Sequence, residues 1–193
     1  MENYFVSEKD DAFDALLPQA YQEFSKIHWT PIAIIEVVLE WLDFHKPKRL
    51  LDIGSGVGKF CLLSAQHSDT EFTGVEKRLK LHEQAILLKD QFSLKNVDFM
   101  HSDIVNIEFI SFDAIYYYQP FCEQISEGDW IDKELDFSSE QFEAYEEYVT
   151  NQLKKSASGT LFISYNATKL ELPSDYIIHD MKFDGMLQLW IKK

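Results

Sequence analysis

The residues best suited to ligand chemistry lie in one short stretch, where an acid and three alternating glycines follow an apolar run. The stretch contains Asp52, Gly54, Ser55, Gly56 and Gly58. The residues after this stretch have apolar side chains at helical spacing. Glycine has no side chain, so the backbone N–H groups of such a loop can approach a ligand closely, at the start of the next helix. The pattern predicts a strand, a ligand-binding loop and a helix.

Three kinds of ligand site use a glycine-rich loop after a strand. A Walker phosphate loop ends in Gly-Lys-Ser/Thr, whereas Gly58-Lys59 is followed here by Phe60. A dinucleotide fingerprint has its third glycine three residues after the second, and Lys59 holds that position. The remaining pattern is acid-x-Gly-x-Gly-x-Gly, beginning at Asp52.

Further polar residues follow the next predicted strands. Glu76 ends a strand over 71–75, and Asp103 follows a strand over 97–100. Tyr118-Gln119-Pro120-Phe121 follows a fourth strand. Since open α/β sheets bind ligands at the carboxyl ends of their strands, we expect these groups to lie close to the glycine loop.

These four features resemble the class I S-adenosylmethionine-dependent methyltransferases over nearly the whole chain. The resemblance implies S-adenosyl-L-methionine as the cofactor. The glycine motif would hold its methionine end, Glu76 its ribose hydroxyls and Asp103 its adenine amine. The predicted cofactor-binding residues are Asp52, Gly54, Ser55, Gly56, Gly58, Glu76, Lys77, Asp103, Ile104 and Thr30.

The fourth motif departs from the pattern of methyltransferases that act on DNA adenine or protein glutamine. Those have Asn or Asp before Pro-Pro-Tyr or a similar run, whereas here Gln119 precedes a single Pro120. A glutamine carbonyl oxygen can accept a hydrogen bond from an amine, so Gln119 is the predicted catalytic residue that orients the acceptor. Tyr118 is the second catalytic candidate. The alternative is that the tyrosines at 116–118 are core and rim aromatics.

Thr30-Pro31 gives a weaker resemblance to the non-SET protein lysine methyltransferases, in which such a segment closes over the cofactor. Thr30 also suits the N-cap of a helix, and Pro31 suits its first position. The spacing therefore predicts a helix from residue 31 to about Phe44.

Charge bears on the methyl acceptor. The net charge is −15, which disfavours a nucleic-acid partner because phosphate binding needs a basic surface. Residues 123–147 carry ten acids and one base, so they would attract a cation if they line the site. We expect the acceptor to be a protein side chain (lysine-like) or a small amine. The alternative for this stretch is a solvated helix face.

Neither the cysteines nor the histidines have metal-ligand spacing. Cys61 and Cys122 are expected to be free thiols, and we expect no metal site. The N-terminus lacks the basic start and apolar run of a signal peptide, and no apolar stretch approaches the roughly 20 residues of a membrane span. The sequence therefore predicts a cytoplasmic protein with no membrane partner.

The order of elements predicts a doubly wound α/β fold, a Rossmann-like seven-stranded sheet with one antiparallel edge strand. Asp184-Gly185 between two alternating runs predicts the closing hairpin. Residues 1–45 are predicted to form an N-terminal helical lid, with one helix over 10–26. Residues 46–193 are predicted to form the S-adenosylmethionine-binding domain of the same structural unit.

The sequence thus predicts an S-adenosylmethionine-dependent methyltransferase acting on a nitrogen. Two alternatives stay open. One is a regulatory module that binds the cofactor without turnover. The other is a small-molecule transferase of the same fold, such as an aminopropyltransferase-like enzyme, although these usually carry an extra acid in the fourth motif.

Overall fold

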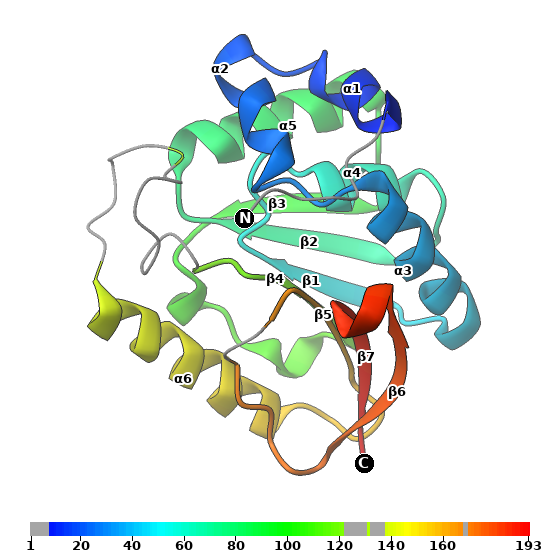
Figure 1. Cartoon of the computed structure of the whole chain (residues 1–193), viewed down its shortest axis with the longest axis vertical. Helices are drawn as coiled ribbons and strands as arrows, with labels where there is room; N and C mark the ends of the chain where they lie inside the picture. Colours follow the sequence, from blue (N-terminus) through cyan, green and yellow to red (C-terminus); the bar gives the residue numbers. More distant parts are fainter. Residues whose placement is uncertain (1–7, 122–130, 132–137, 168–169) are drawn as a thin grey trace.

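The computed structural model describes residues 8–121, 131, 138–167 and 170–193. A seven-stranded sheet runs through this part of the chain in the order β3-β2-β1-β4-β5-β7-β6 (Figure 1). Its strands are β1 (Arg49–Ile53), β2 (Glu71–Glu76), β3 (Val97–His101), β4 (Ala114–Tyr118), β5 (Leu161–Tyr165), β6 (Tyr176–Lys182) and β7 (Leu187–Lys192).

Strands β1 to β5 are parallel, and β7 runs antiparallel to both of its neighbours. This confirms the predicted doubly wound α/β sheet with one reversed strand. The reversed strand is β7, which lies one place in from the edge strand β6. The central strands are buried on both faces, as their continuous apolar runs indicate, whereas β6 is mostly exposed.

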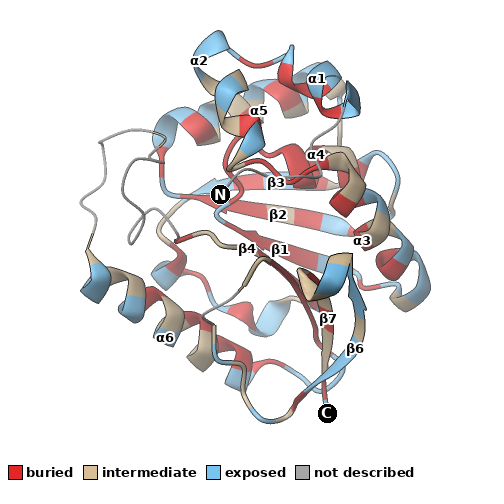
Figure 2. Cartoon of the chain, in the orientation of Figure 1, coloured by how far each residue is buried: buried red, intermediate tan, exposed pale blue. Residues whose placement is uncertain are grey.

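Helices cover both faces of the sheet (Figures 1 and 2). One face packs against α3 (Ile32–His45), α4 (Lys59–Ala65) and α5 (Leu79–Phe92). The other packs against α6 (Ser139–Lys155) and the short 3-10 turns η2 (Ile104–Asn106) and η3 (Phe109–Ser111). Buried apolar side chains fill both layers. Because β1 to β5 are parallel, their carboxyl ends lie together at one rim of the molecule.

Helix α6 begins at a side-chain cap, Ser138. The Ser138 hydroxyl accepts a hydrogen bond from the Gln141 N–H at 3.1 Å, which satisfies a backbone donor of the first turn. Tyr145, Val149 and Leu153 form the buried stripe of this helix. The stripe brings Tyr145 toward the carboxyl ends of the strands.

The predicted single helix over 10–26 is wrong. The segment forms α1 (Glu8–Asp14), α2 (Gln19–Gln22) and the 3-10 turn η1 (Glu23–Lys26). Pro18 separates α1 from α2, and it stands at the N-cap of α2. Proline has no N–H group and its ring clashes with the preceding turn, so the apolar spacing cannot continue as one helix.

The predicted capping role of Thr30 is also wrong. Pro31 occupies the N-cap position of α3, and the Ile32 N–H donates to the Asp10 carboxylate at 3.0 Å. Thr30 is buried, and its hydroxyl hydrogen-bonds the Tyr116 hydroxyl at 3.1 Å. The cap of α3 therefore comes from a residue of α1, which local sequence does not reveal.

Within the residues described, no helix combines the length and the apolar character needed to cross a bilayer. The cytoplasmic location and the division of the chain at residue 45 stay predictions. Cys122 and most of the acidic stretch over 123–147 lie outside the described residues.

Candidate active site

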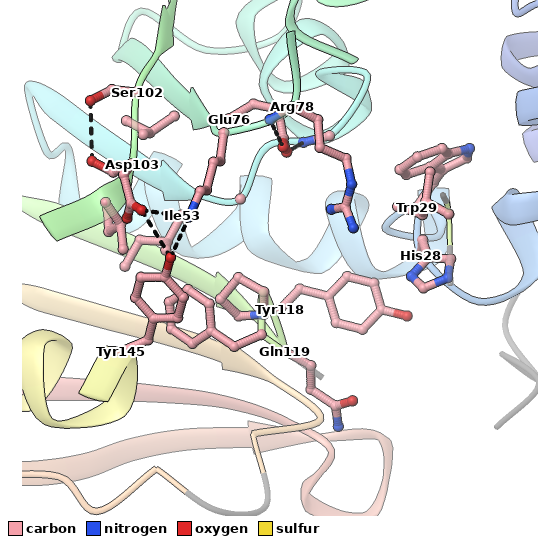
Figure 3. Close-up of a pocket in the computed structure, with 18 of the residues that line it drawn as sticks. His28, Trp29, Ile53, Glu76, Arg78, Ser102, Asp103, Tyr118, Gln119 and Tyr145 are labelled. Carbon is pink, nitrogen blue, oxygen red and sulfur yellow. Dashed lines mark hydrogen bonds and ion pairs between the residues drawn. The ribbon is translucent and has the colours of Figure 1, made fainter. Parts of the chain in front are cut away.

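A pocket lies at the carboxyl ends of β1, β2 and β4, where the strand order reverses between β1 and β4. Open α/β sheets bind ligands at this switch point. The predicted site residues that line it are Gly54, Gly56, Glu76, Lys77, Asp103, Ile104, Tyr118 and Gln119. His28, Trp29, Arg78 and Tyr145 line it as well (Figure 3).

The glycine loop needs glycine for two reasons. Gly54 and Gly56 have φ values of +71° and +56°, which side chains rarely allow. A Cβ on Gly54 would lie 2.7 Å from the Pro120 Cβ, and one on Gly56 would lie 2.7 Å from the Trp29 ring. The loop is therefore packed between the motif after β4 and the N-terminal segment.

Glu76 is held against the glycine loop by backbone hydrogen bonds. One carboxylate oxygen accepts the Gly56 N–H at 3.0 Å, and the other accepts the Arg78 N–H at 2.7 Å. Burial raises the pKa of Glu76, and these N–H groups offset part of that rise. The Lys77 backbone N–H adds to this effect, and the carboxylate lines the pocket, where it can also accept from a ligand's hydroxyls.

Asp103 belongs to a three-residue network. One of its oxygens lies 2.8 Å from the Lys77 ammonium and 2.9 Å from the Tyr145 hydroxyl, and Lys77 also donates to Tyr145 at 2.8 Å. Burial works to raise the pKa of Asp103, but the hydrogen bonds from Lys77 and Tyr145 bring it below its usual value. The carboxyl predicted to meet the adenine amine is thus kept ionised.

Asp52 lies beneath the loop rather than on the pocket wall. Its side chain is 4% exposed, and the Cys61 thiol donates to it at 3.3 Å. Burial raises the pKa of Asp52 to about 7; the Cys61 hydrogen bond opposes this rise, and the Glu76 charge adds to it. A cationic ligand above the loop would favour the ionised form of this carboxyl.

The other predicted residues that do not line the pocket support it. Ser55 is buried, and its N–H donates to the Val75 carbonyl at 3.0 Å. Gly58 lies against Phe99, and Thr30 is bonded to Tyr116 as described above. Their predicted part in cofactor binding stays a prediction.

The motif after β4 has a strained backbone. Gln119 adopts φ +38°, and its side-chain N–H donates to the Asn166 carbonyl, beyond the end of β5. Its amide is turned away from Glu76 and Asp103 (Figure 3). The Tyr118 hydroxyl donates to the Ile27 carbonyl at 2.7 Å. Left-handed backbone at a residue other than glycine costs on the order of 1 kcal/mol.

Four lining residues escape the sequence patterns. His28 and Trp29 precede the predicted helix, Arg78 follows the Glu76 motif, and Tyr145 lies far along the chain. Of these, only Tyr145 has a recognisable sequence pattern, because it belongs to the helically spaced apolar residues of α6. Arg78 is buried and extends into the pocket (Figure 3), which places a cation beside Glu76.

Residues 5–118 match the sequence profile of the family described as protein-L-isoaspartate(D-aspartate) O-methyltransferase. The chain belongs to this family. Membership makes it a class I S-adenosylmethionine-dependent methyltransferase, with S-adenosyl-L-methionine as its cofactor. The weaker resemblance of Thr30-Pro31 to the non-SET protein lysine methyltransferases stays a prediction.

Solved structures with the same fold are distant in sequence. A methyltransferase from Geobacter sulfurreducens has a TM-score of 0.63 at 14% identity, with 98% of this chain and 100% of that chain covered. An RNA methyltransferase from Salinibacter ruber, solved in complex with S-adenosyl-L-homocysteine, has a TM-score of 0.57 at 14% identity, with 84% and 92% covered.

Curated relatives match over short segments. The 23S rRNA (uracil(1939)-C(5))-methyltransferase of Shewanella woodyi is 36% identical over 72 residues, which are 37% of this chain and 16% of that protein. The matches span less than a quarter of the length of the curated relatives. Matches this short say nothing of the acceptor.

Proposed function

We propose that this protein transfers the methyl group of S-adenosylmethionine to a nitrogen on a protein side chain (lysine-like) or on a small amine. The observation that supports this most strongly is that Gln119, whose amide oxygen can accept from an amine, lines the same pocket as the oriented carboxylates of Glu76 and Asp103. The carboxylates suit the cofactor, and the amide oxygen suits an amine.

The residues present fit the cofactor. Glu76 lines the pocket as an acceptor suited to the ribose hydroxyls, and Asp103 is ionised for the adenine amine. Gly54 and Gly56 leave the loop backbone open toward the methionine end. The cofactor supplies a methyl group on a sulfonium leaving group, so the protein's part is alignment and exclusion of water.

The acceptor would lie beside the motif after β4. The Asn166 carbonyl fixes the Gln119 amide through its N–H, which leaves the amide oxygen as the group that can accept from an incoming amine. Tyr118 is held by the Ile27 carbonyl and forms part of the same wall. Both residues would orient the acceptor rather than take its proton.

A carboxylate acceptor is the second candidate. The family description names an O-methyltransferase acting on an isoaspartyl carboxyl, and Arg78 places a buried guanidinium in the pocket. A guanidinium matches the geometry of a carboxylate. This candidate predicts a methyl ester as product, whereas the first predicts a methylamine.

The two candidates are separated by the stability of the product. Purified protein is incubated with methyl-labelled cofactor and a lysate, an isoaspartyl peptide, a lysine-rich peptide, a polyamine or RNA. Label released by mild base as methanol identifies an ester, and base-stable label identifies a methylamine. Base-stable label on a protein or small amine is expected; transfer only to RNA or only as an ester contradicts the nitrogen proposal. Saturable binding of S-adenosyl-L-homocysteine without any transfer would favour a regulatory module.

A further inference from the structure

A buried ion-pair cluster lies outside the pocket, behind the glycine loop. Lys59 directly follows Gly58 as the first residue of α4, and it is 2% exposed. Its ammonium lies 2.7 Å from an Asp10 carboxylate oxygen, 3.6 Å from Asp14 and 3.4 Å from the Ser25 hydroxyl. Asp10 is 0% exposed. A lysine is almost never buried to this degree unless it is paired.

Asp10 connects three elements of the fold. The same carboxylate oxygen that receives Lys59 accepts the Ile32 N–H, the first backbone donor of α3. A negative charge at the N-terminus of a helix is favourable. Asp10 therefore ties α1 both to the helix that follows the glycine loop and to the start of α3.

Trp29 lies between the start of α3 and the glycine loop before α4, the two places that Asp10 connects. It precedes Ile32 by three residues, its indole N–H donates to the Tyr21 carbonyl at 3.0 Å, and its ring covers Gly56 so closely that no Cβ would fit. It also lines the pocket (Figure 3). Any shift of the start of α3 relative to α4 moves this ring on the glycine loop.

The charges of this cluster are costly to keep for stability alone. Burying a lysine and two carboxylates carries a desolvation cost that apolar packing would avoid, and replacing such clusters by apolar side chains can leave stability unchanged. What a cluster with several short contacts provides is a fixed geometry between the elements it joins. Here those elements carry the wall and the floor of the cofactor pocket.

We propose that Lys59 and Asp10 are positioning residues that hold Trp29 on the glycine loop and thereby set the affinity for the cofactor. The proposal rests on the cofactor assignment, and it adds a role for residues that do not touch the pocket. The N-terminal segment would thus act as a rigid part of the pocket lining.

The chain offers a matched control. Lys9 and Glu36 also join α1 to α3, at 2.6 Å, but their side chains are 67% and 54% exposed. The test variant is Asp10→Asn with Lys59→Met, because asparagine can still accept the Ile32 N–H while both charges are removed. Lys9→Met removes the exposed ion pair between the same two helices.

The readout is the dissociation constant for S-adenosyl-L-homocysteine, measured by calorimetry with circular dichroism as the check on folding. The double variant is expected to weaken binding about tenfold, as coupled neighbouring residues do, and Lys9→Met to leave it unchanged. In a Trp29→Ala background the double variant should weaken binding little further, because the ion pair affects cofactor affinity by holding that ring in place. Equal losses with and without Trp29 would overturn the proposal.

Two outcomes are kept apart by design. If the wild-type protein shows no saturable binding of S-adenosyl-L-homocysteine, the cofactor assignment fails. If the double variant does not fold, Asp10→Asn alone replaces it, because Asp14, 3.6 Å from Lys59, can still balance the buried ammonium. It is expected to weaken binding about two- to threefold, and an unchanged affinity would overturn the positioning role.

Discussion

Replacing Asp52 by asparagine should make the protein more stable at neutral and alkaline pH. The Asp52 carboxyl is buried beneath the glycine loop, and burial raises its pKa to about 7 from the ordinary value of 3.8. In the folded protein the carboxyl stays protonated until about pH 7, whereas in the unfolded chain it loses its proton near pH 4. The folded state therefore binds more protons in this range, so wild-type stability falls as the pH rises from about 4 to 7.

The magnitude follows from the size of this shift. One pKa unit corresponds to about 1.4 kcal/mol, so between pH 5 and pH 8 the wild type should lose about 3 kcal/mol of unfolding free energy that Asp52→Asn retains. Asparagine can still accept the Cys61 thiol hydrogen bond, so the variant leaves no partner orphaned. The relative gain should be smaller at pH 5 than at pH 8 and should level off above pH 7.

The assay is urea denaturation of both proteins from pH 5 to pH 8. Asp69→Asn is the control, because Asp69 is exposed and lies in the turn before β2. A difference between Asp52→Asn and wild type that is the same at every pH would refute the reasoning. The same variant tests the predicted role of Asp52 toward the cofactor, since a weaker affinity for S-adenosyl-L-homocysteine at pH 8 would accompany the higher stability.

Three further changes test other parts of the site. Glu76→Gln removes a buried charge that accepts two backbone N–H groups, and it should weaken binding of S-adenosyl-L-homocysteine by about 1–3 kcal/mol by calorimetry; an unchanged affinity would exclude the ribose assignment. Gly56→Ala meets both positive φ and an indole ring at 2.7 Å, so thermal melting should show a loss of at least about 1–3 kcal/mol. Gly159→Ala, with φ +87° and no atom within 4 Å of the new Cβ, should lose less because only backbone strain applies. Lys77→Met removes the cation that lowers the pKa of Asp103, so the pH below which cofactor affinity declines should move upward, and an identical pH profile would contradict this.

Much of the fold and part of the site follow from neighbours along the chain. The alternation of apolar strands with helical stripes specifies the doubly wound sheet, because the buried face of each element is written into its own periodicity. Glu76 and Asp103 follow strands, and parallel strands bring their carboxyl ends together. Gly54 and Gly56 stand out because the loop after β1 needs a backbone that other residues rarely adopt.

What escaped prediction depends on residues that are distant along the chain. Tyr145 reaches Asp103 only because α6 packs on the face of the sheet away from α3, α4 and α5. Trp29 reaches Gly56 only because the N-terminal segment folds back over the glycine loop. The cap of α3 is a carboxylate from α1, where local sequence pointed to a threonine.

The sequence by itself determined the type of sheet, the glycine loop and the acids that converge on it, since these depend on local spacing. Tertiary structure decided which side chains complete the pocket and which acid lies beneath it. The physical reason is that burial and pairing across elements set charge and orientation. Asp52 near the end of β1 and Asp103 after β3 are the same residue type, and yet burial raises the pKa of the first while Lys77 and Tyr145 lower that of the second.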